Sequence, residues 1–596
     1  MASSGTVFDN AYCNVAVCSP SRMSFLSGRR PTTTNIYNFV NHIRQATCEG
    51  AKSGTRWIGA EAQYKNVTVE KVQGAAGECC SQCTRDPACA AWTYVGATVS
   101  DGDNEEVDGS KIDHLHSQGR VPDYCALYGD GYAGSNRTHD RLDAPKGVVS
   151  GLSGRFLSLT ALPQHFKQQG YLALQSGKIW HTEEGDLYGD GMPPNQDAPL
   201  SWSPGCSMAN VNEIANMWAC EKFPGTQGCP IDATADGVVQ DGTAPLCDHV
   251  IGEDAVQKLR LAAKNLQVTG QPFFLAAGFR KPHMPWRFPA PYTTHYPSVD
   301  EIAIAAHPTM DPSVPPIAHH TPDLQYQEGG NPYVAMNKTL AQHDRLYYYS
   351  SVSWTDSRVG LVLDELDTLG LTANTLVVMH ADHGWALGEH GQWQKFNNWE
   401  VGVRVPLIIR APWLHAPPAR TNTLVELVDV FPTMADLAGL KLPTGDDLPL
   451  DGQSVGWALR AQSQSDLRRL EASKGRAAAL SVYARCPLSP DQEHWITNTS
   501  EMWMNNWCEF VDRSAMPWMG YSMRTSEWRY TEWVRWDGDT LSPDWTVKAG
   551  VELYDHNGDN GTSFDTHENV NIAVDHPDVV ARLSKQLHSL VADSAP

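Results

Sequence analysis

A cysteine near the start of the chain opens a segment with the composition of an anion-binding helix. The segment reads Cys18-Ser-Pro-Ser-Arg22, and Gly28 and Pro31 follow it. Proline is tolerated in a first helical turn, and glycine and proline commonly end a helix, so a helix is predicted from Cys18 to about Gly28. Cys18 would lie at its N-terminus, with Arg22 one turn away on the same face. Free N–H groups, a partial positive charge and an arginine around a nucleophile suit an oxyanion such as a sulfate or phosphate ester.

Three more clusters of ionisable residues follow short apolar runs farther along the chain. The runs cover residues 171–174, 272–279 and 375–379, and the clusters after them are Lys178 with His181, Lys281 with His283, and Asp382 with His383. Runs of this length, bounded by glycine or proline, indicate buried strands, and helical patterns over residues 252–266 and 346–369 separate them. The three runs are expected to be neighbouring parallel strands, and ligands of open α/β sheets bind beyond the carboxyl ends of the strands. The residues predicted to converge on Cys18 are therefore Lys178, His181, His283, Asp382, His383 and Lys395.

Two regions depart from the alternation of strands and helices. Residues 48–150 are rich in cysteine and glycine, and they predict a cystine-stapled insertion because few aliphatic runs are present to hold a core. A surface loop with incidental cysteines is the alternative. From about residue 471 the chain is aromatic: residues 526–534 alternate as an exposed strand would, and a helical pattern returns at residues 578–590. A small antiparallel sheet is predicted there.

The bulk composition is that of an ordinary globular protein and excludes some classes of partner. Of 596 residues, 41% are hydrophobic and 19% are charged, with 68 acidic against 45 basic side chains. This acidic balance argues against a nucleic-acid ligand, which selects a basic face. No apolar run reaches the roughly 18 to 20 residues of a bilayer span, so no transmembrane segment is predicted. A local cluster of Lys, Arg and His can still bind an anionic small substrate.

Cysteines and glycosylation sequons indicate a secretory compartment. The chain has 14 cysteines, most of them grouped within residues 79–125, 206–247 and 486–508, and it has Asn-x-Ser/Thr sequons at Asn66, Asn136, Asn337, Asn498 and Asn560. Together they favour an extracellular or lysosomal protein with disulfide bonds and N-glycans.

No signal peptide begins at Met1, so the natural start is expected upstream, and a cytosolic protein is the alternative. A disulfide between Cys13 and Cys18 is the plain alternative to a nucleophilic Cys18.

The Cys18 segment resembles the signature by which formylglycine-dependent sulfatases have their cysteine oxidised. Cys-x-Pro-Ser-Arg, followed by Ser-Gly and Pro, fixes several positions at set spacing. Most of the chain outside the insertion is similar to iduronate-2-sulfatase-like sulfatases, through residues 177–181, 280–285, 381–395, 398–406, 424–432, 519–525 and 552–555. The insertion resembles, more loosely, a PAN/apple module, through residues 54–59, 79–92 and 125–127.

The resemblance implies a fold and a division into domains. The fold would be α/β and alkaline-phosphatase-like, with a mostly parallel sheet flanked by helices, a small C-terminal antiparallel-sheet subdomain and a disulfide-rich insertion. The implied domains are the first part of the catalytic domain, the insertion, the main part of the catalytic domain and the C-terminal subdomain, over residues 1–47, 48–150, 151–470 and 471–596. The implied activity is hydrolysis of a sulfate ester on a sulfated glycan or uronate, and the insertion would bind a glycan or a protein.

The family mechanism implies a role for each candidate residue. Formylglycine derived from Cys18 would hydrate to a diol; one oxygen would attack sulfur, and the second hydroxyl would then expel sulfate, which a plain serine or cysteine cannot do. Arg22 would orient the diol, Lys178 and Lys395 would neutralise the sulfate oxygens, His283 would protonate the leaving oxygen, and His181 would deprotonate the diol. Asp382, His383 and the side chain at position 18 would hold calcium, a hard cation for which the carboxylate is the firmer ligand.

One departure from the family pattern is expected to matter. Sulfatases of this kind carry two adjacent aspartates on a strand upstream of the cysteine, and these carboxylates complete the calcium site. Only Asp9 precedes Cys18 here, so that strand, the two ligands and the signal peptide are expected upstream of Met1, and the 596-residue chain is expected to express poorly and turn over little substrate. A catalytically inactive, carbohydrate-binding sulfatase fold is one alternative. A phosphodiesterase or phosphonate hydrolase of the same superfamily is another.

Overall fold

The computed structural model describes residues 1–39, 159–181, 197, 200–203, 228–239, 245–320, 332–414, 419–486, 508, 511–559 and 567–593. It also gives the backbone of short strands between Lys52 and Leu152. Several predicted features lie outside the described residues: Cys79, Cys80, Cys83, Cys206 and Cys220, and the sequons at Asn136, Asn498 and Asn560.

The start of the chain contributes a strand to a four-stranded sheet. The sheet order is β13 (Val377–His380), β16 (Arg404–Arg410), β1 (Thr6–Tyr12) and β17 (Ala419–Glu426). β1 runs parallel to β17 but antiparallel to β16, and β16 is also antiparallel to β13. Strands β13, β1 and β17 therefore run in the same direction, as a mostly parallel sheet requires, and β16 is reversed because the chain leaves β13 through residues 381–403 and returns along the adjacent strand.

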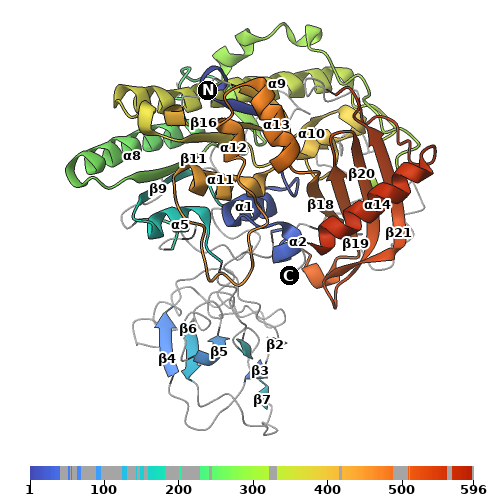
Figure 1. The fold of residues 1–596 in the computed structure, drawn as a ribbon, viewed down its shortest axis with the longest axis horizontal. Helices are drawn as coiled ribbons and strands as arrows, with labels where there is room; N and C mark the ends of the chain where they lie inside the picture. The colour runs from blue at the N-terminus through green and yellow to red at the C-terminus, as the bar shows by residue number, and fades with distance from the viewer. Residues whose placement is uncertain are drawn as a thin grey trace, which may run out of the picture.

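A second sheet pairs β9 (Leu172–Gly177) in parallel with β11 (Phe273–Gly278). Helices α5 (Leu162–Gln168) and α8 (Cys247–Thr269) pack against both strands and flank them in Figure 1. Within the described residues β13 is not hydrogen-bonded to this pair, so the prediction that all three apolar runs are adjacent strands is wrong for β13. The edges of β11 and β13 are only partly covered, since Ala277 is exposed and all of β13 is half-buried.

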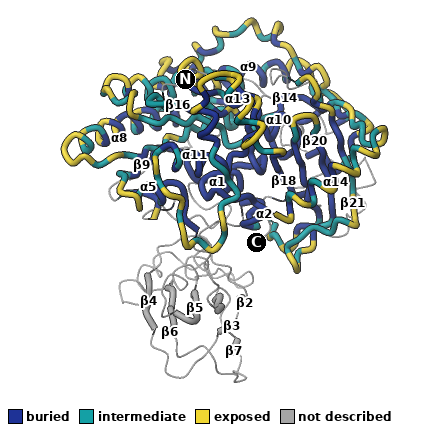
Figure 2. Tube along the Cα trace, in the orientation of Figure 1, coloured by how far each residue is buried: buried dark blue, intermediate teal, exposed yellow. Residues whose placement is uncertain are grey.

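The predicted helices are present and are longer than their sequence patterns. The helix around residues 252–266 is α8, and the helix around residues 346–369 is α9 (Lys338–Thr368). Asn337 caps α9, because its side-chain oxygen accepts a hydrogen bond from the N–H of Thr339 at 2.9 Å. Helix α1 (Cys18–Ser27) packs against α5 and α11 (Val430–Leu437), and Figure 2 shows it buried in the domain.

The C-terminal subdomain is an antiparallel sheet covered by a helix, as predicted. Its strands follow the order β18 (Ala479–Arg485), β19 (Trp518–Arg524), β20 (Trp528–Asp537) and β21 (Ser542–Asp555). Helix α14 (Pro577–Ala592) lies across this sheet in Figure 1, and Leu583 and Leu587 are fully buried in the core beneath it. A disulfide joins Cys486 to Cys508 at the end of β18.

The insertion contains antiparallel strands. A five-stranded sheet has the order β2 (Lys52–Ser53), β8 (Val148–Leu152), β5 (Cys89–Val95), β6 (Tyr124–Gly129) and β4 (Tyr64–Thr68), and β3 (Thr55–Arg56) pairs with β7 (Leu142–Asp143). These strands favour a folded module over an irregular surface loop. Among the described helices, none combines the length and the apolar character that a membrane crossing needs.

Candidate active site

Cys18 is the first residue of α1, as its sequence pattern predicts. The preceding Val17 is extended, and the helix ends at Gly28, whose left-handed φ of 69° suits glycine. The Cys18 side chain is 2% exposed, and its Sγ lies 3.2 Å from both the Nζ of Lys395 and the Nε2 of His383. Burial would raise the pKa of this thiol, but Lys178, Lys395 and His383 outweigh burial and hold it well below its ordinary value. Cys13 and Cys18 are both free, so the disulfide alternative is wrong.

Arg22 connects helix α1 to two of the predicted clusters. Its Nε donates to a carboxylate oxygen of Asp382 at 2.9 Å, and one terminal nitrogen donates to the carbonyls of Lys178 and Ile179 at 2.6 and 2.9 Å. The hydroxyl of Ser21 also donates to the backbone carbonyl of Asp382. These contacts give Arg22 a structural role at the junction of three segments, in addition to the diol contact that the family resemblance implies.

Lys178 and His181 follow β9 directly. The backbone N–H of Lys178 donates to the carbonyl of Gly278 at 2.8 Å, and a Cβ added to Gly278 would lie 1.9 Å from the Lys178 carbonyl. This close approach holds the ends of β9 and β11 together. Burial lowers the pKa of Lys178 to about 8, against a smaller opposite effect of Cys18. His181 is buried against the ring of Phe39, at 4.7 Å between centroids, and burial keeps its pKa well below the ordinary value.

His283 lies on a turn that follows β11 and is anchored from α8. The fully buried carboxylate of Asp248 accepts hydrogen bonds from the N–H groups of Arg280 and Lys281, both at 2.8 Å. The Nζ of Lys281 donates to the carbonyl of His283 at 2.9 Å. The Nδ1 of His283 lies 2.6 Å from the carbonyl of Met284 and must donate there, which leaves Nε2 for the Cys18 side chain. Burial lowers the pKa of His283 to about 3.

Asp382 and His383 follow β13 and face Cys18. Burial would raise the pKa of Asp382, but Arg22 and His383 outweigh it and keep the carboxylate ionised. The Nδ1 of His383 lies 2.8 Å from the carbonyl of Gly384 and donates to it, so Nε2 is the ring atom that faces Cys18. Ligand atoms of Cys18, Asp382 and His383 lie within 4.8 Å of one another. Asp9 is not in this group and is instead paired with Arg420 at 2.6 Å.

Lys395 is held in a strained loop. Its neighbours Gln394 and Phe396 have φ values of 67° and 75°, a left-handed region that residues other than glycine seldom adopt. The ring of Phe396 stacks on His320 at 4.5 Å, and the Nζ of Lys395 lies 5.2 Å from the Phe396 centroid. Burial at 6% exposure and these ring contacts fix the ammonium against Cys18.

The predicted site residues thus lie together in one partly buried region, and the sequence did not indicate two residues that support it. Asp248 lies on α8 and orients the turn that carries His283, but no motif around Asp248 in the sequence indicates this role. Lys281 stands in the predicted Lys-x-His pattern, but that pattern predicted a catalytic role for His283 alone. The Nζ of Lys281, which also donates to the Pro285 carbonyl at 2.7 Å, stabilises the turn rather than a substrate.

Comparison with known proteins supports the family that the sequence motifs resemble. A family model described as Sulfatase matches residues 127–440, more than half of the chain, and a PAN domain model matches residues 60–108. Iduronate 2-sulfatase of Mus musculus is 28% identical, over 93% of this chain and 83% of that protein. Two solved structures share the fold: a phosphonate monoester hydrolase from Silicibacter pomeroyi (17% identity, 99% and 88% coverage, TM-score 0.53) and a 2-O GAG sulfatase (15%, 100% and 85%, TM-score 0.52).

Proposed function

Because this chain belongs to the sulfatase family of sulfuric ester hydrolases, we propose that it removes sulfate from a uronate-containing sulfated glycan, using formylglycine at position 18 and a calcium ion. The observation that carries the proposal is the environment of Cys18. A side chain at a helix N-terminus, 3.2 Å from an ammonium and 3.2 Å from an imidazole, is a nucleophile position built for an anionic substrate.

The residues around Cys18 fit the modification and a divalent cation. The Sγ of Cys18 stands where the oxygens of formylglycine would lie, and formylglycine would supply one oxygen to attack sulfur and a second to expel sulfate. Asp382 offers a carboxylate oxygen and His383 a lone pair on Nε2, both close to position 18. Calcium takes about 6 to 8 ligands, so the rest would be water, substrate or groups beyond the described residues. A bound cation would neutralise negative charge beside the nucleophile.

Lys178 and Lys395 would bind the sulfate oxygens. Both side chains are buried, at 5% and 6% exposure, so their charges act in a region of low dielectric. The pKa of Lys178, about 8, leaves it largely protonated at neutral and acid pH. Two ammonium groups that are already desolvated need little reorganisation when charge develops on the sulfate.

The two histidines suit opposite proton transfers. Burial and the charge of Lys178 keep the pKa of His181 well below its ordinary value, which makes it a neutral base for the position-18 hydroxyl. His283 would donate a proton to the leaving oxygen, although burial and the two lysines lower its pKa in the substrate-free site to about 3. A sulfate group between the lysines would offset their charges and raise the pKa of His283, so protonation would accompany substrate binding.

Two further features support the proposed location and ligands. The Cys486–Cys508 disulfide is typical of proteins from oxidising compartments, which favours an extracellular or lysosomal protein. The PAN-domain match at residues 60–108 supports a separate binding module, and we propose a glycan or a protein as its ligand. The domain limits at residues 47, 150 and 470 remain part of the proposal.

A substrate panel tests the proposal. The chain would be co-expressed with a formylglycine-generating enzyme and assayed with a 2-O-sulfated uronate disaccharide, an aryl sulfate, a phosphate diester and a phosphonate monoester, each with calcium. Although the 596-residue chain is expected to turn over little substrate, the sulfated disaccharide should have the highest kcat/KM, and Cys18→Ala should abolish turnover. Faster turnover of the phosphorus substrates would contradict the proposal, and disaccharide binding without turnover would support the inactive, carbohydrate-binding alternative.

A further inference from the structure

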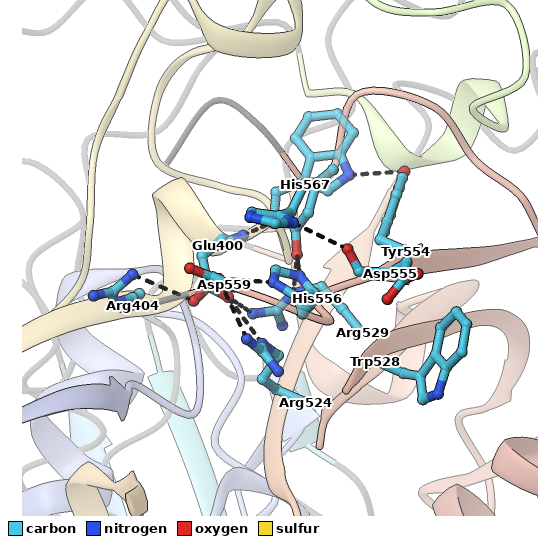
Figure 3. A network of polar contacts seen from close by, with 12 residues as sticks. Glu400, Arg404, Arg524, Trp528, Arg529, Tyr554, Asp555, His556, Asp559 and His567 are labelled. Atoms are coloured by element: carbon cyan, nitrogen blue, oxygen red, sulfur yellow. Dashed lines mark hydrogen bonds and ion pairs between the residues drawn. The ribbon is translucent and has the colours of Figure 1, made fainter. Parts of the chain in front are cut away.

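A cluster of buried charges joins the C-terminal subdomain to Glu400 (Figure 3). Glu400 begins helix α10 (Glu400–Val403), and its carboxylate is paired with Arg529 and lies 3.5 Å from Arg524. Arg529 also pairs with Glu568, which accepts a hydrogen bond from the backbone N–H of Glu400 at 2.6 Å. We call the set of side chains the α10 charge network, and its members are Glu400, Arg524, Arg529, His556, Asp559 and Glu568.

His556 closes this network between two acidic side chains. Its Nδ1 lies 3.0 Å from a carboxylate oxygen of Asp559, and its Nε2 lies 3.0 Å from a carboxylate oxygen of Glu568. Carboxylate oxygens only accept hydrogen bonds, whereas a neutral imidazole has a single N–H. A neutral His556 would therefore turn a lone pair toward one of these oxygens. Only the imidazolium can donate to both.

The other groups around His556 set the charge balance. Arg524 lies 3.5 Å from Asp559, and the ring of His567 stacks on His556 with centroids 5.4 Å apart. Burial alone would lower the pKa of His556, but its hydrogen bonds to Asp559 and Glu568 outweigh burial and the opposing charge of Arg524, so this pKa is raised. Glu568 stays ionised, because Arg529 and His556 hold its pKa far below the ordinary value against burial.

The spacing of these residues could also suggest a metal site. Ligand atoms of Glu400, His556 and Glu568 lie within 4.8 Å of one another. However, guanidinium groups of Arg529 and Arg524 already lie against these carboxylates, and the hydroxyl of Tyr12 donates to Glu400 at 2.9 Å. A divalent cation would meet two buried positive charges. The cluster is therefore an ion-pair network.

Helix α10 connects the network to both catalytic loops. The carbonyl of Gly402 accepts from the N–H of Gly384, the residue after His383, at 2.8 Å. The carbonyl of Val403 accepts from the N–H of Cys13, five residues before the nucleophile, at 2.8 Å. A Cβ added to Gly384 would lie 2.3 Å from the carbonyl of Val401, so this contact has little slack. Any shift of α10 would move both loops.

We propose that His556 is a positioning residue for the sulfatase reaction: as an imidazolium between Asp559 and Glu568, it fixes Glu400 and hence α10, which aligns the Cys18 and Asp382–His383 loops. Without that charge the buried carboxylates of Asp559 and Glu568 have fewer hydrogen-bond donors. The start of α10 is then held less firmly, because Glu568 accepts from the N–H of Glu400. The catalytic groups themselves do not touch His556. Its effect reaches them through α10.

Thermal unfolding of the full chain tests the charge. A group whose pKa is raised by folding contributes stability that is present below the unfolded pKa, about 6.5, and lost as pH rises through the folded pKa. The Tm deficit of His556→Gln relative to wild type should thus be largest near pH 5.5 and shrink by about 2 °C or more towards pH 9. His165→Gln is the control, because burial lowers the pKa of His165 and predicts the opposite trend. An equal deficit for His556→Gln at both pH values overturns the proposal.

Two further measurements keep the test open if His556→Gln does not fold. Nitrogen NMR of histidine-labelled wild type should show one imidazolium that persists above pH 6.5, and Asp559→Asn should lower the pH at which it titrates. A neutral ring at pH 6 overturns the proposal.

If the variant folds, kcat should fall about 2- to 30-fold with little change in KM. An unchanged kcat overturns the positioning role. The thermal and NMR tests require no turnover, so a negative result in either of them can be told apart from a negative sulfatase assay.

Discussion

The Nζ of Lys395 lies 3.2 Å from the Sγ of Cys18, although 377 residues separate them along the chain. Cys18 is fixed because it begins α1, and Lys395 is fixed because Gln394 and Phe396 on either side adopt left-handed backbone angles. The strained backbone of that loop places the buried ammonium of Lys395 beside the first turn of α1, where the helix dipole already favours anions. The position of this positive charge therefore depends on backbone geometry as much as on residue type.

Removal of the Lys395 charge should cost activity far more than stability. We expect Lys395→Met to lower kcat about 100- to 1,000-fold, as loss of one preorganised group for a developing oxyanion does. The matched control is Lys585→Met on α14, where the lysine is exposed, and its kcat should equal that of wild type. Steady-state kinetics with a sulfate ester would measure both variants. A Lys395→Met enzyme within threefold of wild type would show that this ammonium does not act on the sulfate.

Asp248 should matter through the turn that carries His283. Asparagine has one acceptor oxygen, so Asp248→Asn would leave the N–H of Arg280 or Lys281 without a partner, at a cost of about 1–3 kcal/mol in the free energy of unfolding. Displacement of His283 should also lower kcat, by up to about 100-fold. Glu253→Gln, an exposed change on the same helix, is the control. Denaturant unfolding and kinetics would test this account, and unchanged values for Asp248→Asn would refute it.

Local sequence patterns were enough to propose the candidate residues, but they did not indicate which distant segments pair. Cys18 at a helix start, and Lys178, His283 and Asp382 after apolar runs, each stand in a short motif that indicates both an element and a chemistry. The pairing of β13 could not be predicted in this way, because four apolar residues look the same beside a parallel or an antiparallel neighbour. Its partner β16 is chosen by the return of the chain after the catalytic loop.

Buried acidic residues were the other omission. Asp248 and Glu400 each lie near the start of a helix, where an acidic side chain is ordinarily an exposed partner of the helix dipole. Their burial depends on partners from elsewhere, such as Arg529, which lies 129 residues from Glu400 in the sequence. A single sequence contains no local signal for such a pairing.

Calcium should stabilise the protein through Asp382. Addition of calcium to wild type should raise its Tm, since an ion that binds only the folded state at 100 times its Kd contributes about 2.7 kcal/mol. Asp382→Asn should lose most of this shift. Asp466→Asn is the matched control, because Asp466 also pairs with an arginine but lies on the surface helix α13 (Gln464–Lys474). Thermal unfolding with calcium and with a chelator gives the measurement, and an undiminished shift in Asp382→Asn would place the ion elsewhere.

Gly278 should tolerate no side chain. A Cβ there would lie 1.9 Å from the Lys178 carbonyl, so Gly278→Ala must separate β11 from the end of β9, at a cost of about 1–3 kcal/mol or more. The shift would displace Lys178 and lower kcat. Gly360→Ala in α9 meets no atom within 4 Å and should stabilise the helix by up to about 1 kcal/mol. Denaturant unfolding of the pair decides the point, since equal stabilities would mean that the close approach is unimportant.

The chemical state of Cys18 tests the central claim most directly. Trypsin should release residues 1–22 as one peptide that contains both Cys13 and Cys18, because no lysine or arginine precedes Arg22. In protein made in a secretory pathway together with the formylglycine-generating enzyme, mass spectrometry should show that Cys18 has lost its sulfur and two hydrogens and gained one oxygen, while Cys13 is unchanged. An unmodified thiol at position 18, or a disulfide between Cys13 and Cys18, would contradict the assignment of Cys18 as the nucleophile precursor.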